Sequence, residues 1–107
     1  KLMDYLNALH VDHIVMENTH RPMDELEVFR DLRPEIGMGL GVLDVKATMA
    51  ESPDQIARAI ERADKIIGPG RVRYIHPDCG LWNLKRYIAD RKLSALKAGR
   101  DLYEGRN

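Results

Sequence analysis

Apolar positions follow two different spacings along this chain. Three short runs rich in β-branched and apolar residues predict strands, over residues 10–17, 37–45 and 71–75. Four segments with apolar residues three or four positions apart predict helices, over residues 1–9, 22–32, 53–67 and 82–103. Helices and strands therefore alternate from end to end, a pattern typical of a parallel sheet whose strands are connected by helices.

Local signals set the ends of two of these helices. Ser52 precedes Pro53, and Gln55 stands three residues after Ser52, which is the pattern of a capping box with proline at the first helical position. The Gly-Pro-Gly sequence at 68–70 ends the same helix. The Arg-Pro pair at 33–34 ends the helix before it, because the residue before a proline avoids helical backbone angles.

Glycines recur at every second position in the second predicted strand, at Gly37, Gly39 and Gly41. A phosphate-binding loop is one interpretation, but the segment lacks the Lys-Ser/Thr of a P-loop and does not follow a strand as a dinucleotide fingerprint does. We favour a strand face of small residues that leaves room for other groups inside a sheet or barrel.

Three parallel strands alone leave two unpaired edges and an incompletely covered face. We therefore expect the C-terminal three βα units of a TIM (β/α)8 barrel, whose usual size is about 250 residues. Residues 1–107 would be the C-terminal portion of a single catalytic barrel, with the upstream part missing, since the first residue is Lys1 and not Met. The alternative is a non-catalytic barrel fragment that forms a homo-oligomer or assembles with the remainder of the barrel.

The charge of the chain is balanced, with 17 basic and 17 acidic residues. We therefore expect no nucleic-acid partner and no anionic membrane surface. No apolar run approaches the roughly 20 residues that span a bilayer. Cys79 is the only cysteine and cannot form an internal disulfide, which favours a reducing, cytoplasmic location.

Chemically versatile side chains follow each predicted strand: Glu17, then Asp44 and Lys46, then Asp78 and Cys79. In a barrel the carboxyl ends of the strands converge on one mouth. Carboxylate and thiolate are both zinc ligands, so Glu17 and Cys79 are candidates for half of a zinc site. Three alternatives remain: a buried structural cysteine, a helix-capping or ion-paired Glu17, and an Asp44–Lys46 ion pair on one strand face.

Histidines are the natural candidates for the other zinc ligands. His13 lies four residues before Glu17, roughly 13 Å away at the rise of a strand, which is too far to share its ligand shell. His10, His20 and His76 remain possible, but no spacing supports any of them.

Three segments carry a resemblance to a known family: Ile14-Val-Met-Glu-Asn-Thr-His-Arg21, Glu35-Ile-Gly-Met-Gly-Leu-Gly-Val-Leu-Asp-Val-Lys46 and Ile75-His-Pro-Asp-Cys-Gly-Leu81. In this order they resemble the catalytic barrel of cobalamin-independent methionine synthases. The resemblance implies a methyltransferase of methionine biosynthesis, with zinc bound by His, Cys, Glu and Cys. Glu17 and Cys79 would be the third and fourth ligands, and the first two would lie upstream of this chain.

The resemblance also implies substrates and catalytic residues. The methyl acceptor would be the thiol of homocysteine, the donor 5-methyltetrahydrofolate, and the catalytic residues Asp44 and Lys46. The family has a proton-donating histidine where this chain has Lys46, and a lysine side chain with an ordinary pKa of about 10.4 is a poor acid at neutral pH. Because of this departure, an alternative function remains: a related enzyme that uses a methyl-corrinoid donor or alkylates a thiol such as coenzyme M.

Overall fold

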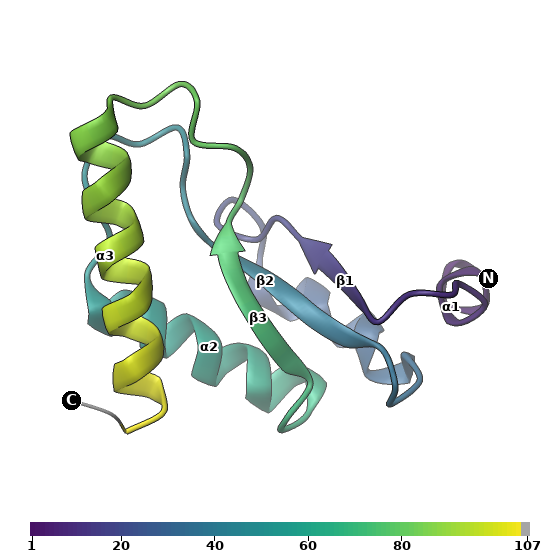
Figure 1. Cartoon of the computed structure of the whole chain (residues 1–107). Helices are drawn as coiled ribbons and strands as arrows, with labels where there is room; N and C mark the ends of the chain where they lie inside the picture. The colour runs from purple at the N-terminus through teal and green to yellow at the C-terminus, as the bar shows by residue number, and fades with distance from the viewer. Residues whose placement is uncertain (106–107) are drawn as a thin grey trace.

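A computed structural model describes residues 1–105 and has the predicted order of elements. The helices are α1 (Leu2–Asn7), the 3₁₀ helix η1 (Met23–Asp31), α2 (Pro53–Ile67) and α3 (Arg86–Tyr103). The strands are β1 (His13–Met16), β2 (Gly37–Leu43) and β3 (Val72–Pro77), which form one parallel sheet in the order β1-β2-β3 (Figure 1). The predicted α/β class with a parallel sheet is confirmed.

The central strand β2 is buried along its whole length. Met38, Leu40 and Val42 alternate with the glycines, so they lie on one face of the sheet, and they belong to a core that includes residues of η1 and α2. Helix α2 also packs against α3. No helix within residues 1–105 is long and apolar enough to cross a lipid bilayer.

Helix η1 has a physical reason to be a 3₁₀ helix. Its apolar residues Met23, Leu26 and Phe29, with Leu32 just beyond, recur every third position, which matches the three residues per turn of a 3₁₀ helix. Leu26, Phe29 and Leu32 are all buried in the core. The amphipathic pattern identified the helix, and the spacing of three fits its tighter winding.

The capping signals of α2 are confirmed. The Gln55 backbone N–H donates to the Ser52 Oγ (3.1 Å), and the Ser52 N–H donates to the Gln55 Oε1 (2.7 Å). Gly68 follows the last helical residue with a φ of 107°, in the region that favours glycine.

Helix α3 differs from the prediction at its start. It begins at Arg86 rather than Trp82, because the Leu84 N–H closes a separate turn onto the Leu81 carbonyl and Lys85 has an extended backbone. Two of its apolar residues, Tyr87 and Leu102, are 54% and 43% exposed. The face of α3 that packs on the rest of the chain instead carries Ile88, Lys92 and Gly99.

The predicted strand bounds also need correction. Strand β1 is shorter than residues 10–17, since only its last part pairs with β2, from His13 to Met16. Strand β3 continues beyond Ile75, because Pro77 still pairs with Leu43.

Gly99 sets how closely α3 approaches α2. A Cβ atom added at this residue would lie 2.5 Å from the Cβ and Cγ2 of Ile56 and 3.2 Å from the Pro53 carbonyl oxygen. These contacts are closer than van der Waals packing allows, so any side chain here must push the helices apart.

We expect Gly99→Leu to lower the free energy of unfolding by about 1–3 kcal/mol, the usual effect of overpacking a core. Denaturant unfolding measures the change. Ala98→Leu, at the exposed neighbouring position, is the matched control and should change stability by no more than about 0.5 kcal/mol. Equal effects of the two substitutions would contradict the packing described here.

Candidate functional site at the carboxyl ends of the strands

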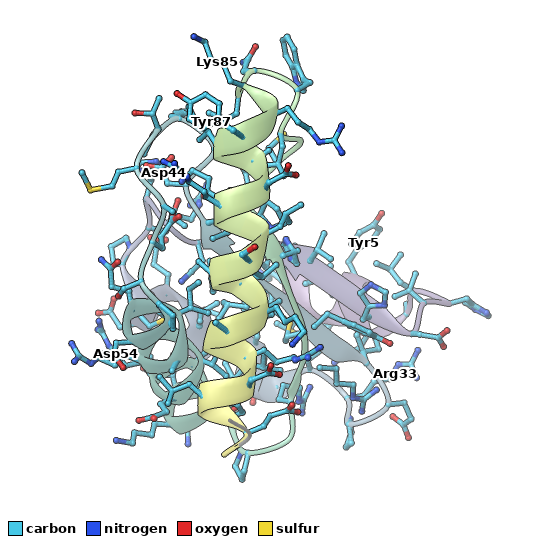
Figure 2. All side chains as sticks on the ribbon, turned by 60° about the vertical axis from the view of Figure 1, so that its left-hand side comes forward. Tyr5, Arg33, Asp44, Asp54, Lys85 and Tyr87 are labelled. Atoms are coloured by element: carbon cyan, nitrogen blue, oxygen red, sulfur yellow. The ribbon has the colours of Figure 1, made fainter. Side chains whose placement is uncertain are left out.

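Because the sheet is parallel, the carboxyl ends of its three strands lie at the same edge. In Figure 2, Asp44 lies at the end of the molecule where α3 begins, marked by Lys85 and Tyr87, and Arg33 lies toward the other end. The residues that follow the strands are therefore gathered at one end, as expected for a barrel mouth.

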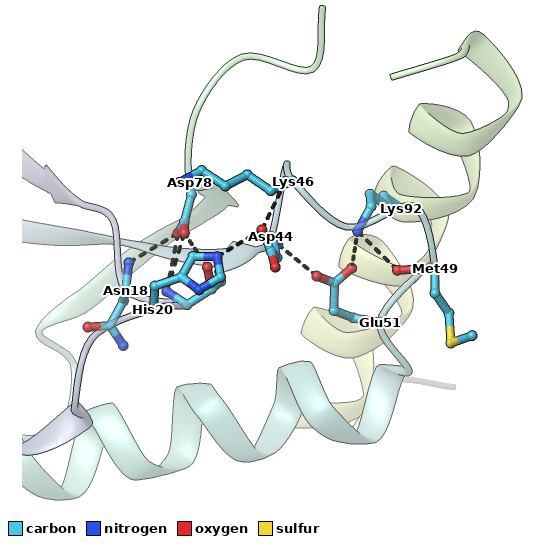
Figure 3. Close-up of polar contacts among 9 residues, drawn as sticks. Asn18, His20, Asp44, Lys46, Met49, Glu51, Asp78 and Lys92 are labelled. Atoms are coloured by element: carbon cyan, nitrogen blue, oxygen red, sulfur yellow. Dashed lines mark hydrogen bonds and ion pairs between the residues drawn. The ribbon is translucent and has the colours of Figure 1, made fainter. Parts of the chain in front are cut away.

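Asp78 joins the end of β3 to the end of β1. Its Oδ1 accepts the Asn18 backbone N–H (3.1 Å), and its Oδ2 accepts the Thr19 backbone N–H (3.3 Å). The Thr19 hydroxyl donates to the same carboxylate (Figure 3). These charge-assisted bonds fix the loop after β1 against the loop after β3.

The Asp78 side chain reaches β1 only because Gly41 has no side chain. Strand β2 lies between β1 and β3, and a Cβ atom at Gly41 would collide with the Asp78 Oδ1 and lie 2.9 Å from the Met16 carbonyl oxygen. At Gly39 an added Cβ would lie 2.8 Å from a methyl carbon of Val15 and 3.2 Å from the His76 ring. The alternating glycines thus leave room for side chains of the flanking strands, as the favoured interpretation expected.

The two predicted zinc ligands each stand next to this hydrogen-bonded pair. Glu17 precedes Asn18 and Cys79 follows Asp78, so each is one peptide unit, about 3.8 Å between Cα atoms, from a residue of the Asn18–Asp78 bond. Both side chains are exposed, and within the described residues neither has a hydrogen-bond or ion-pair partner. The alternatives of a buried structural Cys79 and of a capping or ion-paired Glu17 are therefore wrong for this structure.

The residues described here do not make a complete metal site. No group of three or more His, Cys, Asp or Glu side chains within residues 1–105 is arranged to hold a metal ion. A carboxylate oxygen and a thiolate sulfur nevertheless suit zinc, which takes oxygen, nitrogen and sulfur ligands in tetrahedral geometry. Glu17 and Cys79 thus fit half of a zinc site and would need two further ligands.

Three histidines do not join these residues. His10 precedes β1, at the opposite end of that strand from Glu17. The His13 ring lies 4.5 Å from the ring of Tyr74, centroid to centroid. The His76 Nδ1 lies 2.7 Å from the Pro77 carbonyl oxygen, and its Nε2 is buried without a hydrogen-bond partner within the described residues.

Asp44 forms its ion pair with His20 and not with Lys46, the partner that the sequence offered. It lies just after β2 and not on a strand face, so an Asp44–Lys46 ion pair along a strand is wrong. Its Oδ1 accepts the Lys46 backbone N–H (2.9 Å) and lies 3.0 Å from the His20 Nε2 (Figure 3). The Lys46 N–H, and after it the His20 side chain, holds the pKa of Asp44 below its ordinary value.

An ion pair between the fully buried Lys92 and the partly buried Glu51 holds the backbone of Asp44 in place. Lys92 of α3 is fully buried, and its Nζ donates to the Glu51 Oε1 (2.9 Å) and to the Met49 carbonyl oxygen (3.1 Å). The Glu51 Oε2 accepts the Asp44 backbone N–H (2.7 Å). The sequence did not indicate a role for Lys92 or Glu51, because the basic residues of α3 are mixed with acidic ones, a pattern typical of a solvent-exposed helix face.

A cavity of about 440 Å³ opens beside these groups. Most of the side chains around it are charged or ionisable, and they come from the loops after all three strands and from the start of η1: Glu17, His20, Arg21, Pro22, Glu25, Lys46 and Asp78. Such a cavity suits a polar ligand and proton transfer more than an apolar ligand.

The sequence was compared with known protein families. Residues 1–100 match the family model described as "Cobalamin-independent synthase, Catalytic domain". The chain belongs to this family. The resemblance inferred from the three sequence segments is therefore confirmed.

Individual members of the family agree with this assignment. The methionine synthase of Thermococcus kodakarensis is 37% identical over 98 residues, which cover 92% of this chain and 29% of that protein. The 2-hydroxypropyl-CoM lyase of Xanthobacter autotrophicus is 34% identical over 94 residues, covering 83% of this chain and 25% of that protein. The chain thus spans less than a third of the length of these relatives.

The fold also has a solved counterpart. A B12-independent methionine synthase from Shewanella sp. W3-18-1, solved in complex with selenomethionine, superposes with a TM-score of 0.80 at 24% sequence identity. The match covers 97% of this chain and 30% of that one. The three βα units therefore have the fold of part of a TIM barrel, which confirms the predicted fold class.

We expect Gly41→Ala to lower the free energy of unfolding by about 1–3 kcal/mol, because the Asp78 carboxylate must withdraw and leave its partner N–H groups unsatisfied. Denaturant unfolding and faster hydrogen exchange of the Asn18 and Thr19 amides measure the effect. Gly80→Ala is the control, since an added Cβ there meets only the exposed Trp82 ring. Unchanged exchange in Gly41→Ala would contradict the described crossing.

A second prediction concerns the pH dependence of Asp44. A carboxyl group whose pKa is lower in the folded state stabilises the protein above its unfolded pKa, and this contribution is lost as the pH falls through the folded pKa. His20→Gln should raise the pKa of Asp44 part of the way toward its ordinary value of 3.8, while the Lys46 N–H bond remains. A ¹³C NMR titration of the carboxyl groups measures this shift, and His10→Gln should leave it unchanged.

Proposed function

We propose that this chain is part of a zinc-dependent enzyme that transfers a methyl group to a substrate thiol. The acceptor would be homocysteine and the donor 5-methyltetrahydrofolate, as the name of one relative suggests: the 5-methyltetrahydropteroyltriglutamate–homocysteine methyltransferase of Bacillus cereus, 30% identical over 75% of this chain and 10% of that protein. The observation that carries the proposal is the Asn18–Asp78 hydrogen bond, which joins the neighbours of Glu17 and Cys79 at one edge of the sheet.

Glu17 and Cys79 are proposed to hold the zinc ion together with two ligands from outside this chain. Bound zinc lowers the pKa of a coordinated thiol, so that a thiolate is available at neutral pH. The residues of this chain then orient the reactants, since alignment of thiol, methyl group and leaving atom accounts for much of the rate of such a reaction.

Asp44 and Lys46 are proposed to act on the other side of the cavity. The Lys46 side chain and the Asp78 side chain both contribute to the cavity wall, and Asp44 is fixed by the Lys46 N–H. An ammonium group there favours a polar or anionic part of a donor, and Asp44 keeps the loop after β2 in position.

A second candidate function changes the substrates and keeps the site. The similarity to a 2-hydroxypropyl-CoM lyase and the lysine at position 46 favour an enzyme that acts on a thiol such as coenzyme M or takes its methyl group from a corrinoid. A methyl-corrinoid releases its methyl group without a protonated nitrogen, so no histidine is needed at position 46.

The proposal also places residues 1–107 as the C-terminal portion of a longer barrel in the cytoplasm. Within the described residues, β1 and β3 each have one unpaired edge, and the remainder of the barrel would supply the strands that cover them.

The test is metal analysis of the complete protein with a thiol-methylation assay. We expect about one zinc per chain, loss of zinc in Cys79→Ser and in Glu17→Gln, and methyl transfer to homocysteine or coenzyme M from methyltetrahydrofolate or methylcobalamin. Glu27→Gln, an exposed carboxylate on η1 away from the cavity, is the control and should keep its zinc. Full zinc content in Cys79→Ser would remove this residue from the site.

A further inference from the structure

We propose that His20, oriented by Asp44, is the acid that protonates the leaving nitrogen of an amine-type methyl donor. This inference rests on the proposed function and deepens it, because it names the donor class and the residue that serves it. The sequence alone offers His20 only as a possible zinc ligand.

The geometry is that of a carboxylate-oriented imidazole. The His20 Nε2 lies 3.0 Å from the Asp44 Oδ1, within the distance of an ion pair between an imidazolium and a carboxylate. The other ring nitrogen, Nδ1, has no hydrogen-bond partner within residues 1–105. A carboxylate on one nitrogen fixes the ring and stabilises the imidazolium, and it leaves the other nitrogen to exchange a proton with a ligand.

The imidazole of this pair lines the cavity beside the proposed zinc ligand Glu17. His20 lines the same 440 Å³ cavity as Glu17 and Lys46. Its side chain is 58% exposed, whereas that of Asp44 is 25% exposed, so the imidazole is the accessible member and the carboxylate the more buried one. The other charged groups around the cavity are Arg21, Glu25 and Asp78.

Asp44 is held in place by two hydrogen bonds besides its contact with His20. Its Oδ1 accepts the Lys46 N–H, and its own N–H donates to Glu51, which is paired with the fully buried Lys92. The carboxylate that orients His20 is thus anchored through α3, and Asp44 acts as a positioning residue.

The substrate thiolate attacks the methyl carbon, an S–C bond forms, and the N–C bond breaks with its electron pair going to nitrogen. The imidazolium of His20 gives its Nδ1 proton to that nitrogen and becomes neutral. The thiol released one proton when it became a thiolate, so His20 regains a proton from water and the net reaction consumes none.

Imidazole suits this step better than the neighbouring ammonium. Catalytic acids work best when their pKa lies near the working pH, and the ordinary pKa of a histidine side chain is about 6.5 against about 10.4 for lysine. His20, in the loop after β1, is thus better suited to act as the acid at this end of the sheet than Lys46, in the loop after β2.

The experiment compares two classes of methyl donor in the complete, zinc-loaded protein. Methyltetrahydrofolate needs a proton on its leaving nitrogen, whereas methyl iodide releases iodide without one. We expect His20→Gln to lower kcat with methyltetrahydrofolate by about 10²–10⁴-fold, the usual contribution of an acid. Turnover with methyl iodide, zinc content and thermal unfolding should be unchanged, and His10→Gln, an exposed histidine outside the cavity, should match the unsubstituted protein.

Each other outcome overturns the inference in a distinguishable way. Loss of zinc in His20→Gln would make this residue a ligand, and equal loss with both donors would make it structural. Unchanged turnover with methyltetrahydrofolate, or an unsubstituted protein that accepts methylcobalamin and not methyltetrahydrofolate, would remove the acid role and leave thiol methylation intact. An unsubstituted zinc protein that methylates no thiol from any donor would refute the proposed function itself.

Discussion

The Asp78 carboxylate is the interaction on which the arrangement of the candidate site depends. It crosses β2 above Gly41 and accepts the N–H groups of Asn18 and Thr19, so it ties together two strands that are not neighbours in the sheet. Backbone pairing alone fixes each strand against the next one, but it does not fix the loops that follow. The Asp78 carboxylate fixes these loops, and it thereby sets the positions of the residues next to its hydrogen bonds.

The Lys92–Glu51 pair gives a second fixed point, reached from the helical layer. Isolated buried ion pairs contribute little net stability, because removing both charges from water costs about as much as their attraction returns. What such a pair contributes is a defined geometry. The fully buried Lys92 ammonium requires the Glu51 carboxylate as its partner, and this carboxylate in turn accepts the Asp44 N–H. The loop after β2 thereby has one favoured position relative to α3.

The sequence predicted the order of elements and several bounds because those signals are local. The capping box at Ser52, the glycine at position 68 and the Arg33–Pro34 pair after η1 each depend on residues close together in the chain. The start of α3 was wrong because Leu84 has helical spacing to Tyr87 and Ile88 but lies in a separate turn before the helix. Family membership could be inferred because three short segments carry it in order.

The contacts of the site were harder to predict, since they join residues far apart in the sequence. Nothing near His20 in the chain indicates that Asp44 will lie beside it, and Lys92 reads as one of many basic residues on a surface helix. The glycine spacing indicated that room was needed, but the group that fills it at Gly41 became known only from the fold.

Because Lys92 holds Glu51 in place, the loop after β2 becomes ordered at a defined stage of protein synthesis. Synthesis runs from the amino to the carboxyl end, so the loop that carries Asp44 leaves the ribosome well before α3 does. Until α3 docks, Glu51 lacks its cation and the loop lacks its fixed position. The carboxyl end of the sheet is therefore completed only after α3 has been translated, and a nascent chain cut short before α3 would have its strands without a fixed loop after β2.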